Sequence, residues 1–160
     1  PNSIRVNRGK KTLEDLFLYA LASRVDRIVI VNCVKGNPSS ILVYNVDLDS
    51  KVMKRRYLIK ILGVKLWREV ENNIKIYDPK SICVDVSEIE DDESLRLCDI
   101  IRDILHAKLV TDEEMIRDFD VKVEIYRRNM KFTIRFIHPQ TNRIGGPVIR
   151  VGRAIVYEES

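Results

Sequence analysis

The feature that most limits how this chain can fold is a pair of extended runs joined by a turn signal. The first run, Arg27 to Val34, is rich in β-branched residues and ends at Lys35-Gly36-Asn37-Pro38. The second run, Ile41 to Asp47, alternates between two faces, and a further extended run covers Tyr57 to Val64. Because Gly and Asn accept positive φ and Pro fixes its own φ, the segment between the first two runs predicts a hairpin connection.

A short strand and a helix are expected before this hairpin. Ile4 to Val6 is typical of a strand, and Thr12 can cap a helix whose first turn holds Glu14 and Asp15. The helix should end near Arg24. Its expected buried stripe consists of Leu13, Leu16, Phe17, Ala20 and Leu21, which fall at helical spacing.

The same order of patterns returns in the second half of the chain. The expected elements are a strand at 82–86, a helix at 91–106, a hairpin of 121–127 and 131–138, a loop at 139–147 and a strand at 148–157. Each half therefore reads strand, helix, hairpin, strand, which predicts an internally duplicated α/β (α+β) fold with halves of about 1–80 and 81–160. Hairpins are antiparallel and strands joined through a helix are usually parallel, so a mixed sheet is expected. Coincidence is the alternative, because this order is common in α/β proteins.

Composition excludes several classes of protein. The 160 residues are 45% hydrophobic and 32% charged, as in a globular domain. The longest strongly apolar run, Ile28 to Val34, is far shorter than the roughly 20 residues of a membrane helix. Three cysteines without a CxxC pair exclude a complete disulfide framework and a cysteine-based zinc site, and they suit a reducing cytosol. No secretory signal is recognisable, so we expect a protein without membrane attachment.

Charge is distributed unevenly along the chain. Residues 1–80 carry 16 basic and 8 acidic side chains, residues 81–120 carry 4 and 13, and residues 121–160 carry 8 and 3. Two basic segments separated by an acidic block indicate that one surface meets a polyanion. The alternative is a strongly charged surface of the kind that heat-adapted proteins carry.

The most informative local motif is the loop Asn7-Arg8-Gly9-Lys10-Lys11-Thr12. It places three cations and backbone N–H groups at a helix N-terminus, where the dipole favours an anion. The ending Gly-Lys-Lys-Thr is like that of a P-loop, but the upstream glycine of that motif is missing, which argues against nucleotide hydrolysis. The loop therefore predicts a phosphate cradle for RNA, with a solvated basic turn as the alternative.

The equivalent loop in the second half, 88–93, has the opposite charge. It carries five acidic residues, which stabilise the start of the following helix and repel phosphate. Two turn segments add further candidates for phosphate contact, namely Lys35 and Asn37 in the first hairpin and Arg143 and Arg150 around Gly145-Gly146-Pro147. Turn formation alone also explains both segments.

Catalysis has little support in the sequence. The chain contains no G-x-S-x-G, no H-E-x-x-H and no glycine-rich dinucleotide fingerprint. Its clustered acids lack His or Lys partners at a spacing that would form an acid–base pair, and two histidines are too few for most metal sites. We therefore expect neither catalytic residues nor a metal or cofactor.

Three segments together resemble the Brix-domain family, and most closely its short archaeal members. They are 6–16 (VNRGKKTLEDL), Lys35-Gly36-Asn37-Pro38 after a buried strand, and Gly146-Pro147 before the last strand, so the resemblance spans nearly the whole chain. Family members usually begin with a Thr/Ser-Ser-Arg-x-Pro-Ser segment, whereas this sequence starts at Pro1 without it. The resemblance implies one Brix domain over 1–160, whose halves are each similar to the anticodon-binding domain of class II aminoacyl-tRNA synthetases.

The resemblance also implies a function. Family members are ribosome-assembly factors that bind ribosomal RNA, which implies a non-enzymatic protein. Its implied partners are pre-ribosomal RNA and ribosomal or assembly proteins. Its location would be the cytoplasm in an archaeon and the nucleolus in a eukaryote. The predicted RNA-binding residues are Arg8, Gly9, Lys10, Lys11, Lys35, Asn37, Arg143 and Arg150. Two alternatives stay open: a protein-interaction module that uses the acidic 88–93 loop without direct RNA binding, and an enzyme acting on RNA or nucleotides.

Overall fold

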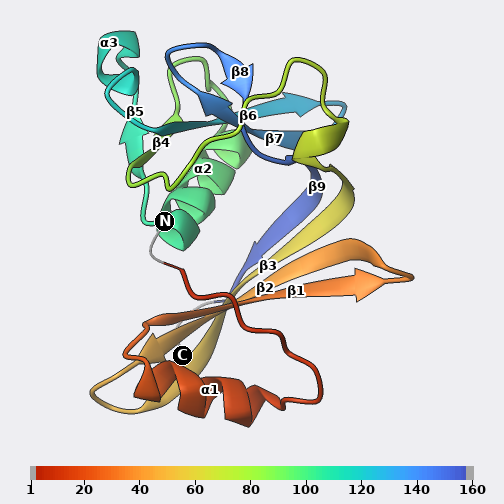
Figure 1. The fold of residues 1–160 in the computed structure, drawn as a ribbon, viewed down its shortest axis with the longest axis vertical. Helices are drawn as coiled ribbons and strands as arrows, with labels where there is room; N and C mark the ends of the chain where they lie inside the picture. Colours follow the sequence, from red (N-terminus) through yellow and green to blue (C-terminus); the bar gives the residue numbers. More distant parts are fainter. Residues whose placement is uncertain (1–2, 158–160) are drawn as a thin grey trace. The chain divides into compact units, whose positions relative to one another are not determined.

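The computed structural model describes residues 3–157, which divide into two compact units (Figure 1). We call residues 3–60 and 154–157 the α1 unit, and Ile61–Arg153 the α2 unit, after the helix that each contains. Two long strands, β3 (Val52–Lys65) and β9 (Val148–Val156), run through both units. The remaining strands are β1 (Arg27–Val34), β2 (Asn37–Asp47), β4 (Ile82–Asp85), β5 (Lys108–Val110), β6 (Val121–Arg128), β7 (Lys131–His138) and β8 (Arg143–Ile144).

The nine strands form a mixed sheet, as expected from the sequence. Their order is β1-β2-β3-β9-β7-β6-β4-β5, with β8 paired to β7 outside this path. The hairpins β1–β2 and β6–β7 are antiparallel, whereas β4 pairs in parallel with both β5 and β6. The parallel pairs arise where a helix connects the strands, because a crossover returns the chain in the same direction.

In the α1 unit, helix α1 (Leu13–Ala22) packs on the β1–β2 hairpin. Leu16 from the helix, Ile30 from β1 and Tyr44 from β2 are buried in one cluster. Val6, Leu13, Ile28, Leu42 and Met53 pack around this cluster. The predicted apolar stripe of the helix is therefore the face that meets the sheet.

The β1–β2 connection is tighter than the sequence suggested. Only Lys35 (φ 50°) and Gly36 (φ 81°) form the turn, and both lie in the left-handed region that a type I′ hairpin turn requires. Asn37 and Pro38 already belong to β2. Pro38 lies opposite Cys33 beside an irregularity in the register, where the missing N–H of proline is tolerated.

In the α2 unit, helix α2 (Asp92–Leu105) packs against β4, β5 and β6. Leu97 and Cys98 are its most deeply buried side chains. A second cluster forms around Cys83, Val110 and Ile116, the last from the short helix α3 (Glu113–Ile116). A 3-10 turn, η1 (Trp67–Glu69), follows β3.

Three details of the predicted fold need correction. Ile4 to Val6 forms no strand in the described chain: Ile4 is 57% exposed and only Val6 packs on the α1 core. The predicted loop 139–147 contains the two-residue strand β8, and the sequence did not reveal β5 or α3. All of these segments are two to four residues long, too short to show a periodicity.

Candidate nucleic-acid interface

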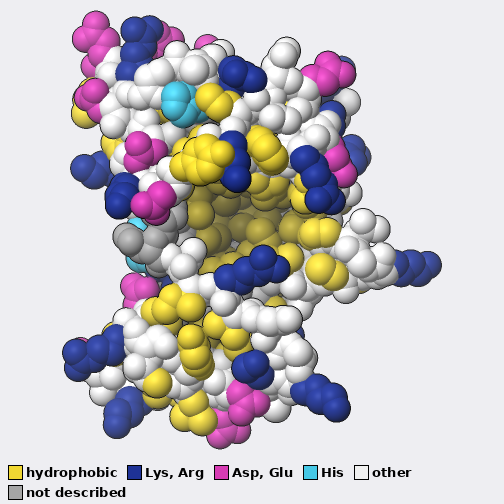
Figure 2. All heavy atoms as spheres, viewed as in Figure 1, with side chains coloured by type: hydrophobic (Ala, Val, Ile, Leu, Met, Phe, Trp, Pro, Cys, Tyr) yellow, Lys and Arg dark blue, Asp and Glu magenta, His cyan; other side chains and the backbone are white. Residues whose placement is uncertain are grey.

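The two units differ in charge. The α1 unit carries 12 basic and 5 acidic side chains, whereas the α2 unit carries 16 basic and 17 acidic ones. Figure 2 shows Lys and Arg side chains dispersed over the visible face of both units, with Asp and Glu among them. The two units therefore differ in net charge, and the α1 unit attracts a polyanion more strongly.

The acidic block of 81–120 has a structural role in the α2 unit, where it neutralises cations of the following segment. Lys122 Nζ lies 3.9 Å from Asp85 Oδ2 of this block, and 2.7 Å from Glu124 Oε1 of its own strand. Arg127 Nη1 lies 3.0 Å from Asp91 Oδ1, and its other nitrogen contacts Glu93. The basic character of residues 121–160 is thus largely offset within their own unit.

The acidic loop 88–93 is also built into the start of helix α2. Asp91 is the N-cap, and its carboxylate accepts hydrogen bonds from the backbone N–H (3.0 Å) and hydroxyl (2.5 Å) of Ser94. These bonds, followed by the contact with Arg127, lower the pKa of Asp91. Helix capping therefore accounts for this carboxylate without a partner protein.

In the α1 unit, the predicted phosphate loop is an exposed turn. Arg8, Lys10 and Lys11 are all exposed, and the Lys11 N–H donates to the Arg8 carbonyl at 2.8 Å. Gly9 has φ 50°, and a Cβ added there would meet nothing within 4 Å. This left-handed conformation favours glycine, and the space beside it is open.

The N-terminus of α1, next to this loop, already binds a carboxylate of the protein itself. Thr12 and Asp15 form a capping box, in which the Thr12 N–H donates to Asp15 Oδ2 at 2.7 Å and the Asp15 N–H donates to Thr12 Oγ1 at 3.1 Å. The hydrogen bond from the Thr12 backbone is the largest cause of the lowered pKa of Asp15. A phosphate at this loop would therefore rely on the cations rather than on the Thr12 N–H.

Lys35 and Asn37 lie at the same end of the α1 unit as this loop. In Figure 1, the loop before α1 and the β1–β2 turn both lie at the right-hand end of that unit. Both residues are exposed, Lys35 in the turn itself and Asn37 at the first position of β2. The structure thus places six of the eight predicted residues in the basic unit.

Arg143 and Arg150 lie in the α2 unit instead. Arg143 is part of β8 and donates from Nε to the Asn72 carbonyl at 3.0 Å, and from Nη2 to the Asn73 carbonyl. Arg150 is an exposed residue of β9, and a Cβ on Gly63 would lie only 2.7 Å from its Nη2. Arg143 therefore holds a neighbouring loop, while the missing side chain at Gly63 leaves room for the Arg150 guanidinium.

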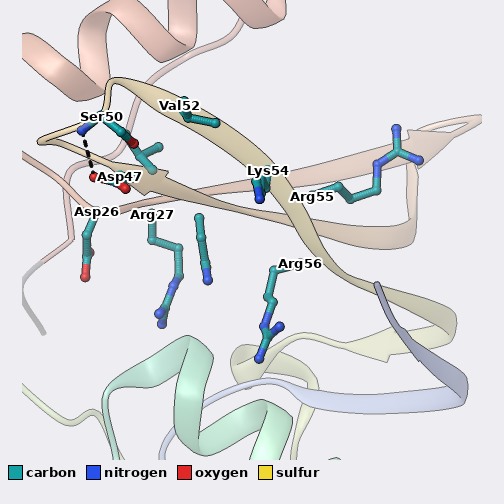
Figure 3. Close-up of a pocket in the computed structure, with 10 residues that line it drawn as sticks. Asp26, Arg27, Asp47, Ser50, Val52, Lys54, Arg55 and Arg56 are labelled. Carbon is teal, nitrogen blue, oxygen red and sulfur yellow. Dashed lines mark hydrogen bonds between the residues drawn. The ribbon is translucent and has the colours of Figure 1, made fainter. Parts of the chain in front are cut away.

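Sequence reasoning missed a second group of cations in the α1 unit. A cavity of about 470 Å³ is lined by Arg27 of β1 and by the consecutive residues Lys54, Arg55 and Arg56 of β3, among others (Figure 3). The run Lys54-Arg55-Arg56 is visible in the sequence and could have drawn attention to this strand. Its association with Arg27 depends on strand pairing.

The structure also bears on other kinds of site. Within residues 3–157, no three His, Cys, Asp or Glu side chains are placed to hold a metal ion. Burial raises the pKa of Cys83 to about 11 and that of Cys98 to about 12, so both stay protonated near neutral pH. No helix in this same range is long and apolar enough to cross a bilayer.

Comparison with curated proteins identifies relatives. No protein-family model matches the chain. A probable Brix domain-containing ribosomal biogenesis protein of Sulfurisphaera tokodaii is 30% identical over 151 residues, covering 94% of this chain and 76% of that protein. The protein of the same description in Thermococcus kodakarensis is 39% identical over 71 residues, covering 44% of this chain and 33% of the relative.

Solved structures agree at the level of the fold. A probable ribosomal biogenesis protein from Aeropyrum pernix K1 matches with a TM-score of 0.75 at 23% identity, covering 96% of this chain and 82% of the other. Mil, an archaeal Imp4-like protein, matches with a TM-score of 0.63 at 16% identity, covering 95% and 81%. The mixed sheet described above is therefore consistent with the fold of these proteins.

Proposed function

Since the chain belongs to the family of Brix domain-containing ribosomal biogenesis proteins, we propose that it acts in ribosome biogenesis as a non-enzymatic protein that binds ribosomal RNA. The observation that carries this proposal is the charge of the α1 unit, with 12 basic against 5 acidic side chains. Cations that neutralise phosphates release counterions, so this charge supplies affinity for RNA that depends on salt.

The proposed contacts follow the placement of the predicted residues. Arg8, Lys10 and Lys11 act through charge on exposed positions, while Gly9 keeps the loop backbone accessible. Lys35 and Asn37 extend this surface at the same end of the unit. Arg143 and Arg150 would contribute from the α2 unit, Arg143 to a smaller extent because its guanidinium already binds two carbonyls.

The proposal includes the organisation of the domain and the setting of its action. We place one Brix domain over 1–160, with halves of about 1–80 and 81–160 related to each other and to the anticodon-binding domain of class II aminoacyl-tRNA synthetases. Support comes from the helix that precedes an antiparallel hairpin in each half, α1 before β1–β2 and α2 before β6–β7. The proposed location is the archaeal cytoplasm, and the proposed further partners are ribosomal or assembly proteins.

Two cysteines and one carboxylate of the α2 unit are poorly suited to catalysis. Thiolates, not thiols, are the nucleophilic form of cysteine, and the raised pKa values of Cys83 and Cys98 keep both groups protonated. The carboxylate of Asp91 is engaged in capping and in an ion pair with Arg127. Within the acidic loop, Asp91 and Glu93 both pair with Arg127, so these two residues give a protein-interaction role less support.

A salt titration of RNA binding tests the proposal. The wild-type protein should bind a structured ribosomal RNA fragment with a log–log salt slope of roughly −4, if about five phosphates are neutralised. Replacing Lys10→Ala together with Lys11→Ala should weaken binding and reduce the magnitude of the slope by roughly 1 to 2. Different RNAs should weaken about equally, since phosphate contacts carry no sequence information.

The matched control is the pair Glu88→Gln and Glu90→Gln, two exposed residues of the acidic loop. This control leaves the Asp91 cap intact and should leave RNA affinity unchanged or slightly raised. A flat wild-type slope would remove the electrostatic basis of the proposal. Loss of binding in the glutamate variant together with a neutral lysine variant would show that the wrong surface has been assigned.

A further inference from the structure

Three adjacent strands, β1, β2 and β3, contribute the main side chains that line the cavity in the α1 unit. Strand register places Arg27 of β1 directly opposite Asn45 of β2, and Asn45 directly opposite Lys54 of β3. Directly opposed residues share one face of a sheet, with Cβ atoms about 5 Å apart. The three side chains therefore form one row across the sheet, with a cation at each end.

A bulge adds Arg56 to this row. Tyr44 pairs with Arg55 and Val43 pairs with Tyr57, so Arg56 is the extra residue of β3 at the register shift. Its guanidinium lies over the Tyr57 ring, 5.4 Å from the centroid, and Nε donates to Tyr57 Oη at 3.3 Å. Figure 3 shows Arg27 and Arg56 extending on the same side of the strands.

Arg55 differs from these three cations. Figure 3 shows its side chain extending away from Arg27 and Arg56. Its guanidinium lies over the rings of Tyr44 and Tyr157, 5.8 and 5.3 Å from their centroids. Arg55 therefore contributes charge to the lining but is held by aromatic contacts.

The negative charges of the cavity are fewer and partly engaged. Asp26 and Asp47 line it together with the four cations. The Asp47 carboxylate accepts from the N–H groups of Asp49 (3.0 Å) and Ser50 (3.1 Å) in the β2–β3 turn. Hydrogen bonds from Ser50 are the largest causes of its lowered pKa. Positive charge therefore prevails in the cavity.

The hydrogen bonding of this row is incomplete. Asn45 Oδ1 is buried and accepts no hydrogen bond within the described chain, although it lies between two cationic residues. A polar network that serves stability alone satisfies its members, because a buried acceptor without a donor is destabilising. The cavity, of about 470 Å³, has the size of small-ligand sites, and the cations that line it carry hydrogen-bond donors.

We propose that this cavity binds backbone phosphates of RNA, with Arg27, Lys54 and Arg56 as the contacting residues. The inference rests on the proposed RNA-binding function and gives it a second contact surface, distinct from the loop at Arg8 to Lys11. Two of the three cations are arginines, whose planar forks bind phosphate through two parallel hydrogen bonds. Several cations around one concave site match the regular charge of a polynucleotide backbone.

The test compares two variants with the same loss of charge. The cavity variant combines Lys54→Gln with Arg56→Gln. The control variant combines Lys51→Gln with Lys60→Gln, two exposed lysines at the β2–β3 turn and on β3 that do not line the cavity. The probe is a single-stranded RNA oligonucleotide of mixed sequence, with its affinity measured across a salt series and in competition with hexaglutamate.

The cavity variant should bind this RNA at least about tenfold more weakly at low salt, and the magnitude of its slope should fall by roughly 1 to 2. The control variant should change much less. Equal weakening in both variants would overturn the cavity site while leaving RNA binding intact. Efficient competition by hexaglutamate would also overturn it, in favour of an acidic peptide. Absence of RNA binding by the wild-type protein would instead refute the proposed function.

A conservative variant distinguishes weaker RNA binding from loss of folding. Arg56→Lys keeps the positive charge and removes the planar fork. It should retain the wild-type unfolding midpoint and bind RNA several-fold more weakly, with a nearly unchanged salt slope. RNA affinity equal to that of the wild type in this variant, together with equal affinity in a folded cavity variant, would overturn the inference.

Discussion

Replacing Leu97 with alanine is expected to lower the free energy of unfolding by about 2 to 5 kcal/mol. Leu97 is 2% exposed on the face of α2 that packs against β4, β5 and β6. Truncation removes buried apolar contacts and leaves a cavity that rigid neighbouring strands fill only partly. Urea unfolding followed by circular dichroism measures the change.

Leu95 on the same helix provides the control. Leu95 is 39% exposed, so Leu95→Ala removes little buried surface. Alanine also favours the helix at least as strongly as leucine does. Its free energy of unfolding should change by less than about 1 kcal/mol. Similar losses in the two variants would contradict the assignment of the buried face of α2.

Replacing Asp120 with alanine should lower the free energy of unfolding by about 1 to 3 kcal/mol. Asp120 Oδ2 accepts from the N–H groups of Lys80 (2.8 Å) and Ser81 (2.9 Å) and from the Ser81 hydroxyl (3.1 Å). These bonds join segments 39 residues apart, immediately before the parallel strands β4 and β6. Asp118→Ala, at an exposed position nearby, is the control and should change stability little.

The Asp120 bonds also predict a pH dependence. Hydrogen bonds from Lys80 and then Ser81 lower the pKa of Asp120 in the folded state. Because the folded pKa is below the unfolded value of about 3.9, this contribution is present above that value and is lost as pH falls through the folded pKa. Asp120→Asn should therefore be closer to wild-type stability at acid pH than at pH 7. A constant difference across this range would refute the role of the ionised carboxylate.

The sequence contained most of the fold because its signals are local. Arg27 to Val34 and Lys131 to His138 are strands with the predicted limits, and both long helices lie within about two residues of their predicted ends. Alternation, helical spacing, caps and turn residues act between near neighbours, so a single sequence reveals them.

Only part of the candidate site could be predicted from such local sequence signals. The loop from Arg8 to Lys11 is contiguous, and its charge and turn could be read from the residues themselves. The row of Arg27, Asn45 and Lys54 exists only through the register of three strands. A slip of one residue would move a strand's side chains to the other face, so register decides which cations meet.

The sequence by itself determined the type and order of the long elements, the excess of positive charge in its first 80 residues and the family resemblance. The tertiary structure decided which charges lie close to one another. It paired Asp85 and Asp91 of the acidic block with Lys122 and Arg127, and it gathered Arg27 and Arg56 around one cavity of the α1 unit. The reason is physical: propensity acts over a few residues, whereas charges interact according to distance in space, which strand pairing sets.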